Sequence, residues 1–219
     1  MEPLTILHRD ERVVVVDKPA GLLVHRTRAG SGEEALLQRL RDQLARRVYP
    51  VHRLDRMASG LVAYGLDPRA AERLQAGLQA EEAVKEYLVL ARGACAPAFA
   101  CRQPLVDDKG IARDAHTSCV RLAFFPALRA SLLRVRIHSG RYHQIRRHLA
   151  LAAHHVVGDP RYGKARTNRD AARRFGLARL FLHAWRLRLE APPIGPLTVE
   201  APLAADLAAV LARMPGSQG

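Results

Sequence analysis

The stretch VHRLDRMASGLVAYGLD, residues 51–67, decides how this chain is interpreted. It places one carboxylate, Asp55, between two arginines, Arg53 and Arg56, just ahead of an apolar run that predicts a strand at 60–66. A carboxylate in a cationic loop stays ionised and can act as a nucleophile or a base. The alternative is a surface turn with exposed ion pairs, and the stretch alone does not separate the two.

The other apolar patterns predict an α+β fold with a mixed, mainly antiparallel sheet flanked by helices, because strands dominate without regular strand–helix alternation. Strands are expected at 12–17, 60–66, 86–91, 116–125, 131–138, 180–189 and 197–200, with an extended piece at 22–25. Helices are expected at 33–47, 67–80, 142–149, 168–175 and 203–213, and residues 95–115 are expected to be rich in loops.

Two residues are candidate helix caps, Ser31 for the first helix and Asp67, followed by a proline, for the second. No change in composition marks a second domain. We therefore expect a single domain over residues 1–219, with a frayed tail at 215–219.

The charge balance indicates a polyanionic partner. The formal net charge is +14 with a sequence pI of about 10.9, and nucleic acid is the first candidate for such a protein. Residues 134–188, called the basic region below, hold fourteen Lys or Arg against only two acids, Asp159 and Asp170. Charge gathered in one quarter of the chain favours a docking face over a uniformly solvated surface.

The sequence disfavours membrane, secreted and metal-binding classes of protein. No apolar stretch is long enough to span a bilayer, and acids and arginines stand where a signal peptide would need an apolar core. We therefore expect a cytoplasmic protein. The three cysteines, Cys95, Cys101 and Cys119, form no CxxC pair and are expected to be small buried residues. His143 and His148 are five residues apart, which does not match a zinc-binding helix.

Two further segments carry candidate RNA-binding side chains. The segment SGRYHQIRRHLALAAHHVVGDPRYG, residues 139–163, predicts a basic helix at a nucleic-acid surface, although its histidines can equally be hydrogen-bonded structural residues; that second interpretation is favoured for His154 and His155. In VKEYLVLARG, residues 84–93, Tyr87 follows Lys85 on the same face of an expected strand. Tyr87 is either a base-stacking residue or a half-buried tyrosine of a sheet.

These segments together resemble the RluA-type pseudouridine synthases. The resemblance is carried, in the family's order, by RVVVVDKPAGLLVHR (12–26), VHRLDRMASGLVAYG (51–65), KEYLVLARG (85–93), SGRYHQIRRHLA (139–150) with VVGDPRYG (156–163), and FLHAWRLRL (181–189). Within the family, the chain is most similar to the tRNA pseudouridine-65 synthase branch. The chain starts without an S4-like extension, so RNA binding is expected to come from the catalytic domain itself.

The resemblance implies the pseudouridine synthase fold with a basic active-site cleft, and isomerisation of uridine to pseudouridine in RNA without cofactor or metal. It implies that Asp55 is the catalytic aspartate, that Tyr87 packs on the target base and that Arg146 pairs with the aspartate. Whether the aspartate attacks C1′ or acts through a glycal stays open. The remaining candidate RNA-binding residues are Arg53, Lys85, Arg141, His143, Gln144, Arg147 and Leu182.

Three functional hypotheses follow. The first is a synthase for uridine 65 of tRNA. The second is the same enzyme class acting on 23S rRNA, or on both rRNA and tRNA. The third is a basic RNA-binding protein without catalysis. We expect a monomer, since no sustained heptad pattern is present.

Overall fold

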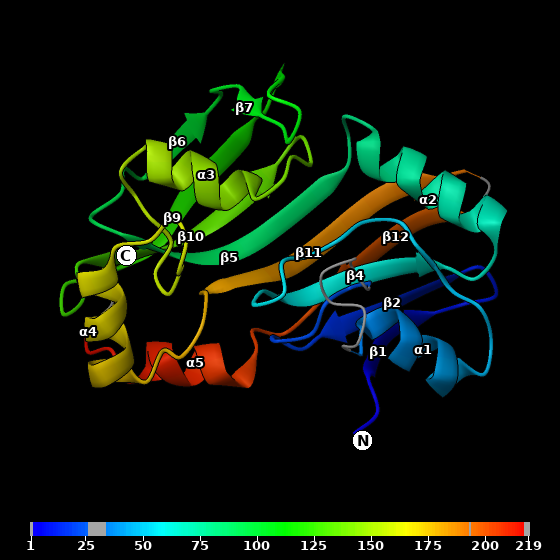
Figure 1. Cartoon of the computed structure of the whole chain (residues 1–219), viewed down its shortest axis with the longest axis horizontal. Helices are drawn as coiled ribbons and strands as arrows, with labels where there is room; N and C mark the ends of the chain where they lie inside the picture. The colour runs from blue at the N-terminus through cyan, green and yellow to red at the C-terminus, as the bar shows by residue number, and fades with distance from the viewer. Residues whose placement is uncertain (1, 26–33, 193, 217–219) are drawn as a thin grey trace. The chain divides into compact units, whose positions relative to one another are not determined.

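The computed structural model describes residues 2–25, 34–192 and 194–216. Within them the chain forms five helices: α1 (Leu36–Leu44), α2 (Pro68–Gln79), α3 (Gln144–Leu151), α4 (Ala165–Phe175) and α5 (Ala205–Ala212). The strands are β1 (Thr5–Arg9), β2 (Val13–Lys18), β3 (Tyr49–Pro50), β4 (Ser59–Gly65), β5 (Val84–Arg92), β6 (Ala98–Cys101), β7 (Leu105–Val106), β8 (Ala112–Arg113), β9 (Thr117–Phe125), β10 (Ala130–Ile137), β11 (Leu182–Ala191) and β12 (Gly195–Glu200) (Figure 1). The expected α+β class with a mixed sheet flanked by helices is confirmed.

The chain divides into two compact units. The first unit comprises Met1–Val84 and Ala184–Pro202, and the second comprises Lys85–His183 and Leu203–Gly219. The expectation of a single catalytic domain over the whole chain stays a prediction, and most of the expected frayed tail, residues 217–219, lies outside the described residues.

In the first unit, hydrogen bonds join neighbouring strands in the order β1, β2, β4, β11 and β12, and β3 adds to β4. The β-branched run at Val13–Val16 is fully buried in β2, which explains why it contains no polar alternation. Helix α2 begins as expected, because the Asp67 side chain accepts a hydrogen bond from the Ala70 amide (2.8 Å).

In the second unit, strands β5, β10, β9 and β6 are adjacent in that order, and each of these pairs is antiparallel. Helix α3 covers part of this sheet, since buried His148 hydrogen-bonds through Nδ1 to Thr117 Oγ1 of β9 (2.8 Å). Helices α4 and α5 contribute Phe175 and Leu207 to an apolar cluster with Leu90 of β5. The HQIRR segment is thereby held on a rigid sheet.

Some expected boundaries are wrong. Helix α1 begins at Leu36 and not at 33, because Ala35 forms a parallel bridge with Leu23 and holds the chain extended. The expected extended piece at 22–25 is reduced to this single bridge residue, Leu23. Its N-cap is Ala35, without a side-chain hydrogen bond, while the expected cap Ser31 lies outside the described residues.

Three other boundaries shift as well. Helix α3 starts two residues later than expected and α4 three residues earlier. The expected loop at 95–115 contains β6 and the β7–β8 hairpin, whose turn is held because the Asp107 side chain accepts hydrogen bonds from the Lys109 and Ile111 amides. In the part of the chain that is described, no helix is both long and apolar enough to cross a membrane.

Candidate active site

Asp55 is half-buried in the loop that leads from β3 into β4 of the first unit. Its carbonyl accepts a hydrogen bond from the Ala58 amide (3.1 Å), which closes a tight turn immediately before the buried start of β4. The small residues that follow Asp55 in the sequence are therefore explained by packing, because Ala58, Ser59 and Gly60 are all buried. Arg53 lies on the same loop and is exposed.

A buried lysine ties this loop to the turn that follows β2. Lys18 has no exposed surface, and its Nζ donates hydrogen bonds to the carbonyls of Pro19 (2.8 Å), Leu22 (2.9 Å) and Arg56 (3.1 Å). Three carbonyl dipoles replace the hydration that the ammonium loses on burial. Because Arg56 directly follows Asp55, Lys18 fixes the backbone beside the candidate catalytic carboxylate.

Gly21 and His52 supply further anchors to the same loop. The Gly21 amide donates to the Arg56 carbonyl (2.8 Å), and Arg56 Nε donates back to the Gly21 carbonyl (3.0 Å). At the other end, His52 Nε2 accepts a hydrogen bond from the Ala63 amide of β4 (3.0 Å). The loop around Asp55 is thus anchored on both sides, as a group that must meet a substrate at a fixed geometry requires.

Tyr87 and Lys85 lie on β5 in the second unit, as the sequence predicted, and both are half-buried. Tyr87 faces Val135 in the antiparallel pair of β5 with β10. Burial, together with the charge of nearby Arg136, lowers the pKa of Lys85 from its usual value. Both residues are therefore partly accessible to solvent, as a residue that contacts a ligand needs.

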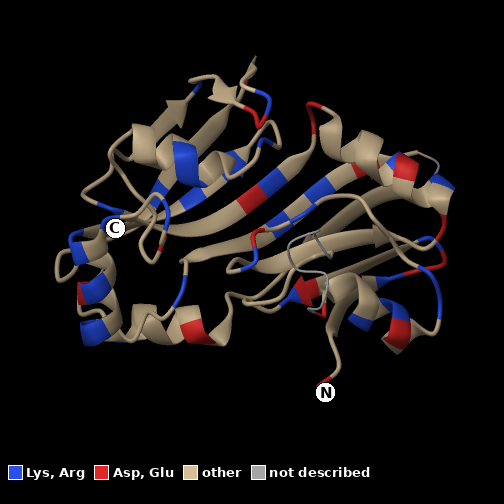
Figure 2. Ribbon diagram, viewed as in Figure 1, with Lys and Arg blue, Asp and Glu red and all other residues tan. Residues whose placement is uncertain are grey.

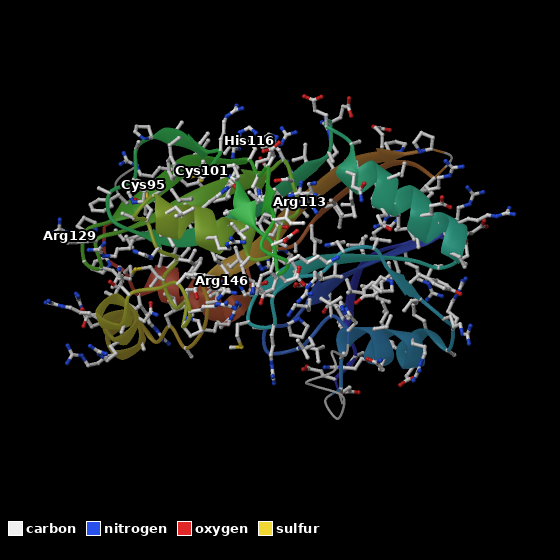
Figure 3. The ribbon with its side chains drawn as sticks, turned by 45° about the horizontal axis from the view of Figure 1, so that its top comes forward. Cys95, Cys101, Arg113, His116, Arg129 and Arg146 are labelled. Carbon is white, nitrogen blue, oxygen red and sulfur yellow. The ribbon has the colours of Figure 1, made fainter. Side chains whose placement is uncertain are left out.

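Arg146 lies on α3 (Figure 3). It is buried and held in a bidentate ion pair. Its Nε and Nη2 each lie 2.8 Å from a carboxylate oxygen of Asp159. Asp159 also accepts hydrogen bonds from the amides of Arg161 (2.8 Å) and Tyr162 (3.0 Å). Burial alone would raise the pKa of Asp159, but the hydrogen bonds from Arg146 and the two amides outweigh it, so the pKa is lowered. The plane of the guanidinium is therefore fixed.

The loop before α3 is locked by Gln144. Its Oε1 accepts hydrogen bonds from the Ser139 hydroxyl (2.8 Å) and the Arg141 amide (3.0 Å), and its Nε2 donates to the His116 carbonyl (2.9 Å) and to Thr117 Oγ1 (3.0 Å). Gln144 is only 3% exposed, so in this structure it organises the loop from inside.

The remaining candidates differ in exposure. Arg141 is exposed and donates from Nε to the Asp114 carbonyl (2.9 Å), and Arg147 is half-buried. Leu182 is buried at the start of β11. The structure thus gathers Arg141, His143, Gln144, Arg146 and Arg147 at the start of α3.

The catalytic candidates are divided between the two units, with Asp55 in the first and Tyr87 and Arg146 in the second. The expected pairing of Asp55 with Arg146 stays a prediction. Sequence reasoning missed two residues that position the site. The sequence held one signal for each. Lys18 stands at the end of a run of buried-type valines, and Asp159 is one of only two acids in the basic region.

His154 and His155 make the hydrogen bonds expected of structural residues, although both are half-buried and lie after the end of α3. Nδ1 of His154 hydrogen-bonds to the Arg92 carbonyl (3.1 Å), and Nδ1 of His155 to the Tyr162 carbonyl (2.6 Å). The three cysteines are buried free thiols, also as expected. Among the described residues, no group of three or more His, Cys, Asp or Glu side chains could hold a metal ion.

A family model described as RNA pseudouridylate synthase matches residues 12–151, which include Asp55, Tyr87 and Arg146. The chain belongs to the RNA pseudouridylate synthase family. It is therefore an isomerase that acts on RNA. The match runs from β2 through α3, so it contains the Lys18 turn, the Asp55 loop and the locked start of α3 in one family pattern.

Relatives and solved structures agree with this membership. The tRNA pseudouridine synthase C of Salmonella typhi is 35% identical over 222 residues, covering 91% of this chain and 85% of that protein. The protein of the same name from Pasteurella multocida is 36% identical over 207 residues, covering 84% of each. The structure of human RNA pseudouridylate synthase domain containing 4 has the same fold, with a TM-score of 0.80 at 24% identity, covering 98% of this chain and 94% of that one.

Proposed function

We propose that this RNA pseudouridine synthase isomerises uridine 65 of tRNA, with Asp55 as its catalytic carboxylate. The observation that carries the role of Asp55 is its loop, which Lys18, Gly21 and His52 hold in place around a half-buried carboxylate. The tRNA substrate is supported by the relatives' common name, tRNA pseudouridine synthase C, together with the match over most of their length.

The reaction breaks the N1–C1′ bond, turns the base and forms a C5–C1′ bond, while the C5 proton leaves and N1 gains a proton. Asp55 acts at the sugar, either on C1′ or on the 2′ proton. Tyr87 packs on the base and assists removal of the C5 proton, and Arg146 pairs with Asp55. A uridine in a stacked stem must first be flipped out, and Arg53 is suited to fill the space that it leaves.

The basic region is proposed to hold the RNA backbone. Lys85, Arg141, His143 and Arg147 would contact phosphates or bases around the flipped nucleotide. Buried Gln144 would hold the loop that presents them, and Leu182 would supply an apolar wall. We further propose that the enzyme works in the cytoplasm as a monomer, without cofactor or metal. The alternative target is 23S rRNA, alone or together with tRNA.

The target is tested by mapping pseudouridine in the tRNA and rRNA of cells with and without the gene. We expect one tRNA position, 65, to lose pseudouridine when the gene is removed and to regain it when the gene is restored. Loss in 23S rRNA alone would replace the tRNA assignment with the rRNA alternative.

The catalytic roles are tested with an unmodified tRNA transcript by counting pseudouridine formed per enzyme. Asp55→Ala should fold, bind the transcript with an affinity close to wild type and form no pseudouridine. Tyr87→Phe should also bind but react at least ~100-fold more slowly, because it loses the group that assists proton removal. Turnover by a pure Asp55→Ala preparation would remove Asp55 from catalysis.

A further inference from the structure

An exposed aromatic ring lies just before α3. Tyr142 is 52% exposed, and among the described residues it is the one aromatic residue in the group of exposed large apolar side chains. It follows exposed Arg141 and precedes His143, both of which are candidate RNA-binding residues.

Tyr142 is part of a short aromatic stack. Its ring lies on the His143 ring, with centroids 3.7 Å apart and an angle of 24° between the planes. The His143 ring in turn meets Tyr162 edge-on, with centroids 5.6 Å apart, and His143 Nδ1 lies 3.2 Å from the Tyr162 hydroxyl. One face of the Tyr142 ring is therefore covered and braced by His143, while about half of the surface of the residue is exposed to solvent.

The stack is held ready before any ligand binds. His143 adopts a left-handed backbone with φ of +51°, a conformation that is unfavourable for a residue with a side chain. The hydrogen bonds that Gln144 makes to Ser139 and Arg141 hold the loop in this shape. Unfavourable backbone kept by its surroundings is typical of ligand-binding segments.

Guanidinium groups lie at the Tyr162 end of the stack. The guanidinium carbons of Arg146 and Arg161 lie 5.1 and 5.3 Å from the centroid of the Tyr162 ring. The helix continues with Arg147, and Arg141 is exposed beside Tyr142. An aromatic face among guanidinium groups suits a ligand that offers both a flat ring and a negative charge, which a nucleotide of RNA does.

We propose that Tyr142, braced by His143, is a stacking platform for an unpaired base of the RNA substrate other than the reacting uridine. This inference rests on the proposed function, in which Tyr87 packs on the reacting base. A protein partner is disfavoured, because the exposed cations beside the ring favour a polyanion. Stacking of this kind strengthens binding with little preference among bases.

The test measures the dissociation constant of the full-length protein for an unmodified tRNA transcript at several salt concentrations. Tyr142→Ala should weaken binding about 10-fold, a typical effect of losing one stacked base, whereas Tyr142→Phe should stay within about 2-fold because the ring is kept. Tyr142→Ala should leave the slope of log K against log salt unchanged, since no phosphate contact is lost. Arg141→Ala should make this negative slope shallower by about 1.

The matched control is Leu151→Ala. Leu151 is 62% exposed on the same helix and carries no aromatic ring, so its loss should leave binding unchanged. A ten-nucleotide oligouridylate and a ten-mer of the same backbone without bases provide a second test. Wild type should prefer the oligomer with bases, and Tyr142→Ala should lose most of that preference.

Three results would each refute the stacking role of Tyr142. The first is unchanged binding by Tyr142→Ala. The second is that Tyr142→Phe weakens binding as much as Tyr142→Ala does, and the third is that Leu151→Ala weakens it as much. Each substitution is made in the Asp55→Ala background, and Asp55→Ala alone is the reference protein, so binding does not depend on turnover. If Tyr142→Ala weakens binding but the protein with Asp55 intact forms no pseudouridine in tRNA, the proposed substrate is refuted and the platform stands.

Discussion

Two buried charged residues position the proposed catalytic groups. Lys18 and Asp159 are both buried, and each satisfies its charge through several short hydrogen bonds. Neither is proposed to touch the substrate. Each instead holds a proposed catalytic element in place, Lys18 the Asp55 loop and Asp159 the Arg146 guanidinium.

Lys18→Met should lower the free energy of unfolding by about 2–4 kcal/mol, because the carbonyls of Pro19 and Leu22 lose this donor in the interior and the Arg56 carbonyl keeps only the Gly21 amide. The measurement is urea unfolding at pH 7. Lys109→Met, at an exposed turn residue, is the matched control and should change the free energy by less than about 0.5 kcal/mol. Equal effects of the two substitutions would contradict the role given to Lys18.

Asp159→Asn should destabilise the protein at neutral pH by about 3–5 kcal/mol, because Arg146 would be left buried with an incomplete partner. The folded state lowers the pKa of Asp159 below its usual 3.8. This carboxylate therefore stabilises the fold above about pH 4, and that contribution is lost as pH falls through the lowered pKa.

Urea unfolding of wild type and Asp159→Asn should consequently give a large difference at pH 7 that shrinks towards pH 3. Asp42→Asn, which removes an exposed ion pair with Arg41, should show little difference at either pH. A gap between wild type and Asp159→Asn that is equally large at both pH values would rule out this explanation.

At the scale of elements, most strands and helices lie where the sequence predicts them, because their apolar spacing is regular over many residues. The errors are the ends and contacts of these elements, and short strands that were not expected: β1, β3, β6, β7 and β8. Helix α1 loses its expected first turn to a bridge between Ala35 and Leu23. Close packing of β4 on β11 was also not foreseen, since it depends on a residue more than a hundred positions away, Ala184.

Gly60→Ala tests that packing. Gly60 has φ of +105°, and an added Cβ would lie 2.2 Å from the Ala184 carbonyl oxygen. Gly110 also has positive φ, +81°, but has open space around it. Both substitutions suffer backbone strain, but only Gly60→Ala adds a clash, so it should be more destabilising than Gly110→Ala by roughly 2–4 kcal/mol. Thermal unfolding of the two variants measures this, and similar losses would show that β4 can move away.

At the scale of the whole molecule, the charge is unevenly distributed. Figure 2 shows Lys and Arg recurring along α4, and the basic region provides seven exposed cations between residues 141 and 174. They are Arg141, Arg161, Lys164, Arg166, Arg169, Arg173 and Arg174. Such a set supplies affinity for the RNA backbone, while shape and base contacts supply selectivity.

Binding of an unmodified tRNA transcript should therefore weaken steeply with salt. If about half of the seven cations reach phosphates, log K against log salt should have a slope of roughly −3. Arg173→Gln should make the slope shallower by up to about 1. Arg69→Gln, at an exposed residue of α2 outside the basic region, should leave it unchanged. Salt-insensitive binding would refute the electrostatic role of the basic region.

The amino-acid sequence by itself determined the helices and the longer strands, the α+β class, the basic region and the family, because these depend on local spacing, composition and short motifs. Only the tertiary structure decided which partners complete each site. Lys18 meets a carbonyl 38 residues away, and Gln144 meets Thr117 of β9 and the preceding residue His116, 27 and 28 positions earlier. Local patterns carry no record of such pairings, because they arise when distant segments pack together and every buried polar group must find a partner.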